Sequence, residues 1–434
     1  MRNARELVAA LLVSLLALCA CQVTEEKIER WKGTQNGPKK LAGTLIDPEI
    51  ETDLRARAGA ALVEINEWQL FHESFKKMER ADAQEVIKAI ATRIGKIVES
   101  AGETISREQI DAKDGLFMMV EFADSEALAA LRKPLVHWCT RGDYNKRAMA
   151  GNHNAKTIVE KLGPPAAEAM IDVLKMDNPT IEHVANLIRE AGDEKVFEKA
   201  SSHWAEQLES NVSSIGELHL VVAAIIGGEA IADTLIELAT DKNLSPELQR
   251  FALRAFSMAL DKEHIEPSDE RLQKLLEMAK NEEYDKFQRE ETYLTISQAG
   301  GEEQVDQVAR LLEEEDFFWR LVGLRCLLRM DGENQLARLL ATDDLATSGQ
   351  QVNDVILWVA RFPKLLPQVR EVAQQGGPFA RGVAIYVMGA IGKKEEIALL
   401  KKLADSKMKL PRGFEHKTVG EAAKAVLADL EKKG

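Results

Sequence analysis

Short segments with the same order of apolar and polar positions recur along the chain. Examples are "EAGDEKVFEKA" at 190–200, "QAGGEEQVDQV" at 298–308 and "AIGKKEEIALL" at 390–400. In each segment the apolar end of one helix meets a glycine-containing turn, and acidic or polar residues then open a new apolar periodicity. We expect the glycine to take the left-handed conformation that ends many helices, and the acidic residues to favour the first turn of the next helix.

Turns of this kind are spaced almost evenly. They fall at Gly163, Gly192, Gly227, Asp261, Gly300, Asp331, Phe362 and Gly392, with a mean spacing of about 33 residues. A period of about 20 to 50 residues is typical of solenoids, in which each repeat packs only against its neighbours. Each period has room for two helices, such as 302–314 and 317–330. The second of these has apolar residues on more than one face, so we expect it to lie between neighbouring helices.

The clearest repeat is the segment 36–65. Its first half contains Leu41 and Leu45 at helical spacing, and an Asp47-Pro48 turn follows. Its second half begins with "LRARA", in which Arg55 follows an apolar residue and precedes alanine. This segment resembles a HEAT repeat. The resemblance implies an all-α fold, an α-solenoid of roughly 11–12 stacked HEAT-like helix pairs.

The resemblance also implies that a turn aspartate and a helix arginine of one repeat interact. It assigns this structural role to two pairs, Asp47 with Arg55 and Asp316 with Arg320, and it places Arg381 at the same position of a later repeat. The repeat after Asp241 departs from the pattern, because Gln249 stands at the arginine position.

We divide the body of the chain into N-terminal repeats over 34–145 and C-terminal repeats over 146–434, the last ending in a helical cap. The HEAT-like pattern is blurred between 66 and 145. Diverged repeats are our interpretation of this region, and a separately inserted helical domain is the alternative.

The first 20 residues have the features of a signal peptide: a basic start followed by a short apolar run. This run is shorter than the roughly 20 residues that a spanning helix needs. The segment Leu18-Cys19-Ala20-Cys21 resembles the bacterial lipobox, although Cys19 is unusual at its position. The resemblance implies cleavage between Ala20 and Cys21, lipidation of Cys21, and a lipid-anchored tether over 21–33. An ordinary cleaved signal peptide is the alternative.

This reading predicts a location in the cell envelope. Gln22 follows Cys21, and a residue other than aspartate there implies transfer to the outer membrane in enteric-type bacteria. Which side of that membrane the protein would face stays open.

The formal net charge of the chain is −14, which argues against nucleic acid as a partner. Cys139 and Cys326 lie in distant repeats of the predicted solenoid, so we expect two buried thiols and no disulfide between them. Trp31, Trp68, Trp319 and Trp358 could be interface anchors, although packing between repeats is the simpler interpretation.

We find no catalytic constellation in the sequence. Ser74 and Lys77 have the spacing of a penicillin-binding nucleophile motif but lack its partner motifs, and "DAKDG" at 111–115 does not begin a calcium loop. His183, His203 and His219 fall in adjacent repeats without carboxylate support. We therefore expect no catalytic residue, metal or cofactor, and no small-molecule ligand.

The function that these features favour is a membrane-anchored envelope lipoprotein that acts as a scaffold. Its protein partners would bind the concave face of the solenoid, which we expect the second helices to line. Two alternatives stay open: a structural spacer of the envelope, and a HEAT-like repeat enzyme such as a lyase.

Overall fold

The computed structural model describes residues 23–102, 104–141, 147–300, 302–341, 345–392 and 394–433. Within these residues the secondary structure is helical, apart from one isolated bridge between Lys409 and Thr418. The prediction of an all-α fold is therefore confirmed. Contacts divide the chain into two compact units, Met1–Val212 with Val221–Ile226 and Ser213–Leu220 with Gly227–Gly434. Each unit is considered by itself.

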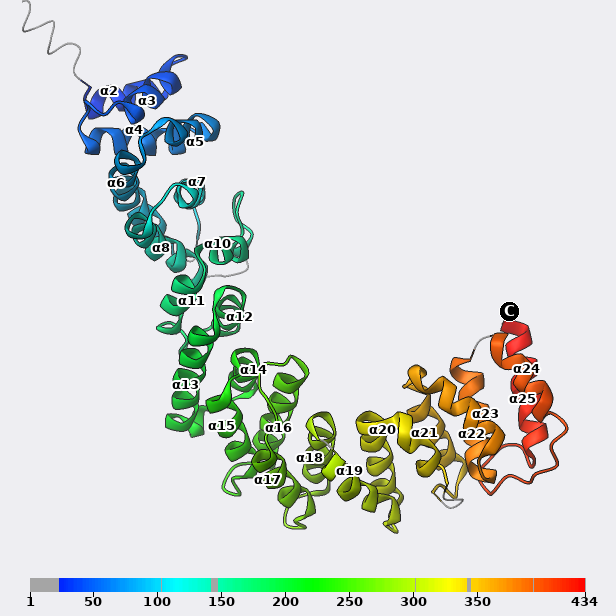
Figure 1. Ribbon diagram of the computed structural model, residues 1–434. Coiled ribbons are helices and arrows are strands. Elements are labelled where there is room, and N and C mark those ends of the chain that lie inside the picture. Colours follow the sequence, from blue (N-terminus) through cyan, green and yellow to red (C-terminus); the bar gives the residue numbers. More distant parts are fainter. Residues whose placement is uncertain are drawn as a thin grey trace, which may run out of the picture. The chain divides into compact units, whose positions relative to one another are not determined.

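The helices of the first unit follow one another in pairs (Figure 1). After α2 (Glu25–Lys32) the pairs are α3 (Gly37–Ile46) and α4 (Thr52–Glu64), α5 (Trp68–Lys77) and α6 (Arg80–Glu99), α7 (Arg107–Met118) and α8 (Ser125–Thr140), α10 (Ala155–Leu162) and α11 (Pro164–Ile171), and α12 (Ile181–Ala191) and α13 (Glu194–Ser210). The second helices form a continuous row, because α4 contacts α6, α6 contacts α8, α8 contacts α11 and α11 contacts α13. First helices also meet, as α3 does with α5 and α10 with α12. Such neighbour-to-neighbour packing defines a solenoid.

The region with the blurred sequence pattern packs in the same way as its neighbours. Helices α5 to α8 continue both the order of pairs and the row of second helices. The boundary that the sequence suggested at 145/146 falls within residues 142–146, which lie outside the described part of the chain.

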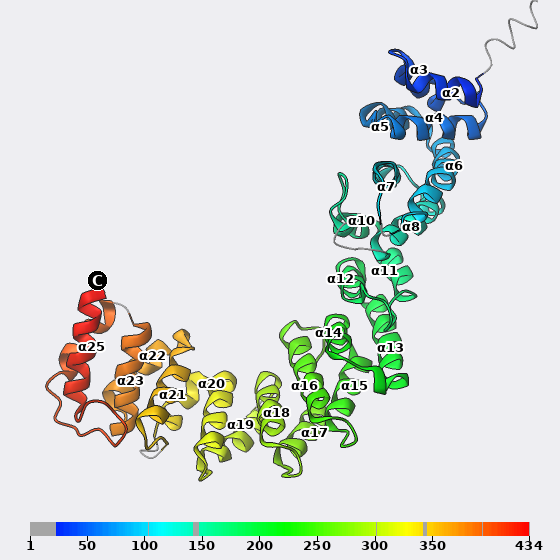
Figure 2. The same cartoon turned by 180° about the vertical axis from the view of Figure 1, so that it is seen from behind.

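The second unit repeats this arrangement, seen from behind in Figure 2. Beyond α14 (Glu217–Ile226), its helices are α15 (Glu229–Thr240), α16 (Pro246–Asp261), α17 (Asp269–Lys280), α18 (Lys286–Ala299), α19 (Glu302–Ala309), α20 (Phe317–Leu339), α21 (Gly349–Ala360), α22 (Leu366–Gln375), α23 (Pro378–Ile391), α24 (Ile397–Leu403) and α25 (Val419–Lys433). Here α16 contacts α18, α18 contacts α20, α21 contacts α23 and α23 contacts α25. The predicted α-solenoid of stacked helix pairs is confirmed in both units.

Helix α20 confirms two details of the sequence prediction. The chain departs from helical geometry at Asp331, with φ −153° and ψ 45°, so the element is two helices joined at the predicted turn. The apolar residues predicted to be buried in the first of these helices are buried: Val322, Leu324, Cys326, Leu327 and Leu328. A second helix lies between neighbouring helices, so its side chains must be buried on more than one side.

The expected positive φ of the turn glycines is found at Gly163 (67°) and Gly227 (66°), although a ψ of −160° places Gly163 outside the left-handed helical region. The expectation was wrong at Gly192, Gly300 and Gly392, whose φ values of −76°, −75° and −70° suit any residue. At these turns the constraint is close approach. A Cβ on Gly192 would lie 2.7 Å from the Ile188 carbonyl oxygen, and one on Gly300 would lie 2.9 Å from the Ile296 oxygen. Glycine therefore provides room for a tight corner between consecutive helices.

No helix in the described part of the chain combines the length and the apolar character that crossing a membrane requires.

Candidate functional site

The predicted lipidation and cleavage residues, Cys21 and Ala20, lie outside the described residues. Most of the segment assigned to the tether, however, is helix α2. Its N-cap is Thr24, and its Ile28 is fully buried against the first repeat, since α2 contacts α3 and α4. Folded structure therefore begins within a few residues of Cys21.

Arg55 is buried, with 2% of its surface exposed, and it joins three helices. Its Nε donates a hydrogen bond of 3.0 Å to the carbonyl oxygen of Leu45, in the last turn of α3. Its two terminal nitrogens donate to the carboxylate of Asp82, in the first turn of α6. The prediction that Arg55 pairs with Asp47 was wrong. The Asp47 carboxylate instead accepts a hydrogen bond from the backbone of Glu49 in its own turn.

The contact between Arg55 and the end of the first helix recurs in other repeats. In four second helices, the residue at the fourth position makes this contact: Arg55, Gln249, Arg289 and Arg381. Arg289 donates to the Ala279 carbonyl at 2.8 Å, Arg381 to the Gly376 carbonyl at 2.7 Å and Gln249 to the Asp241 carbonyl at 2.6 Å. Each side chain thus caps the C-terminal end of the preceding first helix, where carbonyl groups lack partners within the helix. Gln249, which seemed to depart from the pattern, makes the same contact.

The pair predicted between Asp316 and Arg320 does not form. Asp316 accepts a hydrogen bond of 2.8 Å from Lys286 Nζ, which belongs to the preceding repeat. That bond lowers the pKa of Asp316. Arg320 also occupies the fourth helical position, but its Nε is buried without a hydrogen-bond partner among the described residues. The Lys286–Asp316 bond joins two neighbouring repeats, as the Arg55–Asp82 bond does. The HEAT resemblance had instead implied a contact inside a single repeat.

The first unit contains a pocket of about 410 Å³ that three successive repeats build. Trp68 and His72 line it from α5, Phe117 and Met118 from the end of α7, and Lys161 from α10. Glu121, in the short helix η1 (Met119–Glu121), and the loop residues Asn152 and His153 complete the lining. Its volume falls within the range of about 300 to 1,000 Å³ that is usual for ligand sites. Trp68, Phe117 and Met118 give the wall aromatic and apolar surface, and the charged residues Glu121 and Lys161 are exposed to solvent.

A buried ion pair fixes the loop that forms one side of this pocket. Lys113 and Asp114 on α7 are 0% and 1% exposed and pair with each other. Lys113 Nζ also donates to the carbonyl oxygens of Ala150 and His153, at 2.8 and 2.6 Å. Asp114 accepts from the backbone N–H of Asn152 at 2.7 Å. Both pocket residues of the loop are thereby held to the same helix that supplies Phe117 and Met118.

Gly151 allows the loop to come so close to α7. It has a φ of +81°, and a Cβ there would meet the carboxylate of Asp114. Burial lowers the pKa of Lys113, and the neighbouring Asp114 partly offsets this effect. A buried ammonium group with a single carboxylate partner is stable here because its remaining protons reach carbonyl oxygens.

Aromatic and polar contacts shape the pocket further. His72 Nε2 contacts the Glu121 carboxylate and its ring packs edge-on against Phe122, at 5.2 Å between centroids. The rings of Phe117 and His153 lie 4.5 Å apart. Burial lowers the pKa of His153 and so favours its neutral form. Trp68 was predicted as a possible anchor from its residue type alone. The other pocket residues were not predicted, because only the stacking of repeats brings them together.

The candidate chemical residues do not converge. His203 contacts the Leu174 carbonyl oxygen, and His219 accepts a hydrogen bond from the Gly216 backbone. Across the described ranges no group of three His, Cys, Asp or Glu residues could hold a metal ion. Cys139 and Cys326 are free and buried, as expected, and burial raises the pKa of each thiol to about 12. Neither sulfur is therefore a ready nucleophile at neutral pH.

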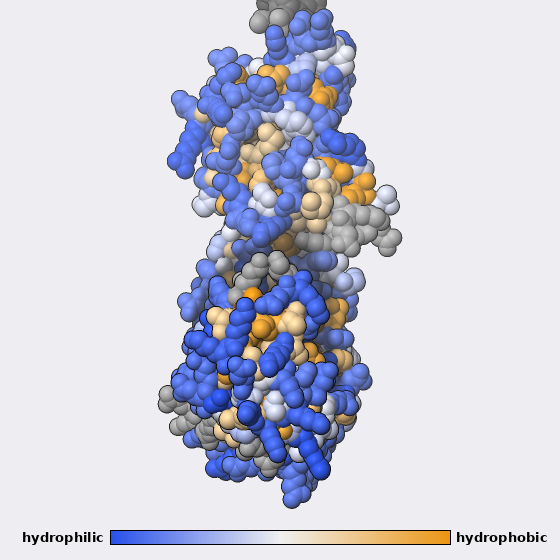
Figure 3. Space-filling model, turned by 90° about the vertical axis from the view of Figure 1, so that its right-hand side faces the viewer, coloured by the Kyte–Doolittle hydropathy of each residue, from blue (hydrophilic) through white to orange (hydrophobic). Residues whose placement is uncertain are grey.

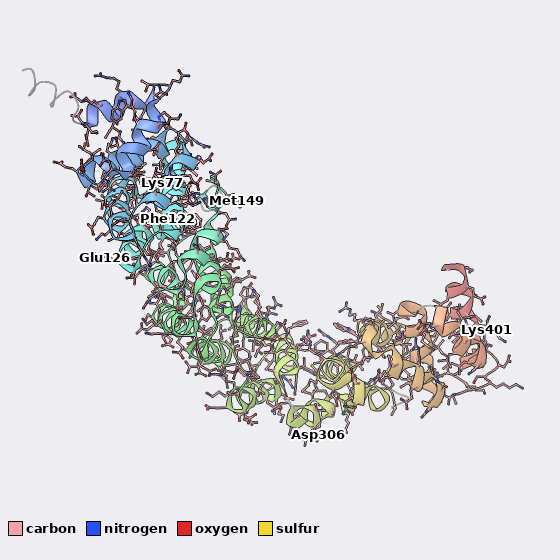
Figure 4. All side chains as sticks on the ribbon, turned by 45° about the horizontal axis from the view of Figure 1, so that its top comes forward. Lys77, Phe122, Glu126, Met149, Asp306 and Lys401 are labelled. Atoms are coloured by element: carbon pink, nitrogen blue, oxygen red, sulfur yellow. The ribbon has the colours of Figure 1, made fainter. Side chains whose placement is uncertain are left out.

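The face shown in Figure 3 is mainly hydrophilic, with small separate apolar groups. Trp31, Trp68, Trp319 and Trp358 are all partly exposed, whereas Trp138 and Trp204 are fully buried. Trp319 nevertheless packs between repeats, as the simpler interpretation predicted, because its ring meets that of Tyr293 on α18 edge-on, with the centroids 6.1 Å apart. The loop beside the pocket also presents Met149, which is 75% exposed and is marked in Figure 4.

No protein-family model and no curated protein matches the sequence. Among solved structures, the chain is similar to the crystal structure of the karyopherin Kap121p bound to the extreme C-terminus of the protein phosphatase Cdc14p. The identity is 12% and the TM-score is 0.22, over 91% of this chain and 48% of the karyopherin. The chain thus spans about half the length of that protein, and so distant a likeness assigns neither a family nor a function.

Proposed function

We propose that this protein is a scaffold that binds a partner protein through the pocket of its first unit. The observation that carries the proposal is the assembly of this pocket from three successive repeats, with Trp68, Phe117 and Met118 presenting apolar surface. Large aromatic groups set in a concave site are the usual anchors of protein recognition. The rim of His72, Glu121 and Lys161 supplies polar groups around the apolar wall.

The fitting occupant is an extended or helical segment of another protein that inserts one apolar or aromatic side chain. Because α5, α7 and α10 are first helices, this pocket does not lie on the second helices, where partners were predicted to bind. The prediction of partners on a concave face lined by second helices stays a prediction.

We further propose that the scaffold is a lipoprotein of the cell envelope, anchored through Cys21 and located at the outer membrane. The lipobox-like segment supports this proposal. Only residues 22–24 separate Cys21 from α2, whose Ile28 is packed into the first repeat. A lipid on Cys21 would therefore hold the first unit, and its pocket, close to the bilayer.

The alternative to a scaffold is a structural spacer of the envelope. That the protein lacks catalytic activity stays a prediction. Purification of the tagged protein from its own cells, with quantification of the proteins that accompany it, separates a scaffold from a spacer. A scaffold yields a defined partner with the wild type, much less of it with Trp68→Ala or Lys161→Glu, and an unchanged amount with the exposed control Lys401→Ala. Equal recovery with all four proteins, or no partner at all, would contradict the proposal.

A further inference from the structure

The second helices of the second unit form a hollow of about 250 Å³. Helices α16, α18, α20 and α21 contribute to it in succession. Its lining is Ser257, Glu291, Leu294, Ser297, Gln298, Arg325, Arg329, Trp358 and Phe362. Arginine, tryptophan and apolar side chains thus occur together in one concave site, which the function proposed above does not use.

Trp358 positions two arginine side chains of this region. The guanidinium carbon of Arg325 lies 4.3 Å from the centroid of the Trp358 ring, and that of Arg361 lies 4.0 Å from it. Contact with an aromatic ring engages the plane of a guanidinium and leaves the N–H groups at its edge able to donate. Arg361 makes no side-chain hydrogen bond or ion pair within the described part of the chain. The N–H donors of Arg361 are therefore held in place by Trp358 and are available to bind a ligand.

The charges around the hollow are only partly balanced. Arg325 pairs with Glu290, and Arg254 pairs with Glu291 at 3.4 Å. Gln298 donates to the carboxylate of Asp261 at 3.1 Å. Arg329 is exposed and, like Arg361, has no carboxylate partner among the described residues. Arg329 lines the hollow, and Arg361 lies against the Trp358 ring that forms part of its wall, so these two positive charges stand at this site in a chain whose net charge is −14.

We propose that this hollow binds a short acidic segment of a partner protein. Carboxylates of the segment pair with Arg329 and Arg361, whose planar guanidinium groups can hold a carboxylate through two parallel hydrogen bonds. An apolar side chain between the carboxylates packs on Leu294 and Phe362 in the hollow. The inference goes beyond the function proposed above, because it names a second site in the other unit and the chemistry of the segment that this site would bind.

The acidic residues at the border set the size of the ligand. Glu290, Glu291 and Asp261 would repel a long polyanion, and a nucleic acid carries a charge at every phosphate. A segment with a few carboxylates can avoid them while it reaches Arg329 and Arg361. The charge pattern therefore favours an acidic peptide over nucleic acid.

Fluorescence anisotropy of the purified full chain with a labelled Glu-Glu-Leu-Glu-Glu peptide tests the proposal. We expect the isosteric Gln-Gln-Leu-Gln-Gln peptide to bind about tenfold more weakly, and the Glu peptide to weaken as salt is raised. Arg329→Gln and Arg361→Gln should each weaken binding by about fivefold, the scale of a partly exposed ion pair. Arg30→Gln, an exposed arginine of the other unit, is the matched control and should change nothing.

Equal binding of the two peptides, or Arg329→Gln and Arg361→Gln variants that bind like the wild type, would overturn the inference. The inference would also be overturned if inorganic phosphate displaced the peptide while acetate at the same ionic strength did not. The site would then select a phosphoryl group rather than a carboxylate. Trp68→Ala should leave peptide binding intact. If the Glu peptide does not bind but the wild type still recovers a partner that Trp68→Ala loses, only the inference about this hollow is rejected. If the Glu peptide binds but no partner is recovered through the pocket of the first unit, only the scaffold proposal for that unit is rejected.

Discussion

Arg55 and Asp82 join two neighbouring repeats through a paired hydrogen bond, with Nη1 2.6 Å from one carboxylate oxygen and Nη2 bonded to the other. The same guanidinium caps α3 through Leu45. The Arg55 side chain therefore holds together the two helices of its own repeat and also bonds to the next repeat. A cation at the C-terminal end of α3 and an anion in the first turn of α6 both suit the helix dipoles.

This pair makes stability depend on pH in the acidic range. The hydrogen bonds from Arg55 lower the pKa of Asp82 in the folded protein. The contribution of the pair is complete above the unfolded value of about 3.9 and is lost as the pH falls through the lowered folded value. We expect the thermal midpoint to fall less between pH 6 and pH 3 in Asp82→Asn than in the wild type. Circular dichroism at 222 nm measures it.

Asp405→Asn is the control for that experiment, because the Asp405 side chain is 97% exposed. Its pH profile should follow that of the wild type. An Asp82→Asn profile that also follows the wild type would show that the pair contributes nothing.

Lys113→Met should destabilise the first unit strongly, because it leaves the Asp114 carboxylate buried without its cation. We expect a loss of about 3 to 5 kcal/mol, the usual cost of breaking a buried pair. Hydrogen exchange should rise first at the Asn152 amide, which bonds to Asp114. Lys77→Met, at an exposed position on α5, is the control. Unchanged protection at Asn152 would contradict the role assigned to the pair.

Gly192→Ala should cost about 1 to 3 kcal/mol, although its φ of −76° is ordinary. The added Cβ would meet both the Ile188 carbonyl and the Phe197 ring, which lies 2.5 Å away. Gly43→Ala is the opposite case, because nothing lies within 4 Å of a Cβ there. In helix α3 it should stabilise by about 0.4 to 1 kcal/mol. Denaturant unfolding compares the two, and equal effects would refute the close-approach explanation.

Cys21→Ser should move the protein from the membrane fraction to the soluble fraction and abolish incorporation of labelled palmitate. Cys19→Ser is the matched control, because Cys19 is removed with the signal peptide in this proposal. Membrane retention of Cys21→Ser, or equal release of Cys19→Ser, would reject the anchor.

The sequence predicted what is local and periodic in this fold. The helix pairs, the turn at Asp331 and the buried second helices follow from apolar spacing and turn residues. The partners of Arg55 and Asp316 could not be predicted, because these bonds cross from one repeat to the next. Lys113 and Asp114 are adjacent in sequence, and neighbours on a helix do not share a face. Their shared burial depends on the loop at 150–153, which no periodicity reveals.

The candidate sites were less predictable than the fold for the same reason. Trp68 and Trp358 were recognised as possible anchors from residue type alone. Phe117, Met118 and His153 join Trp68 only after three repeats have stacked. Arg325 and Arg329 of α20 line one hollow with Trp358 of α21 only because these two helices stack.

Photo-crosslinking in cells tests the central claim most directly. A benzoylphenylalanine residue replaces Met118, in the pocket wall, or Lys401, the exposed control on α24 marked in Figure 4. We predict one defined protein adduct at position 118, identified by mass spectrometry, that is lost when Trp68→Ala is added and is absent at position 401. No adduct at 118, or the same adducts at both positions, would contradict a partner-binding pocket in this solenoid.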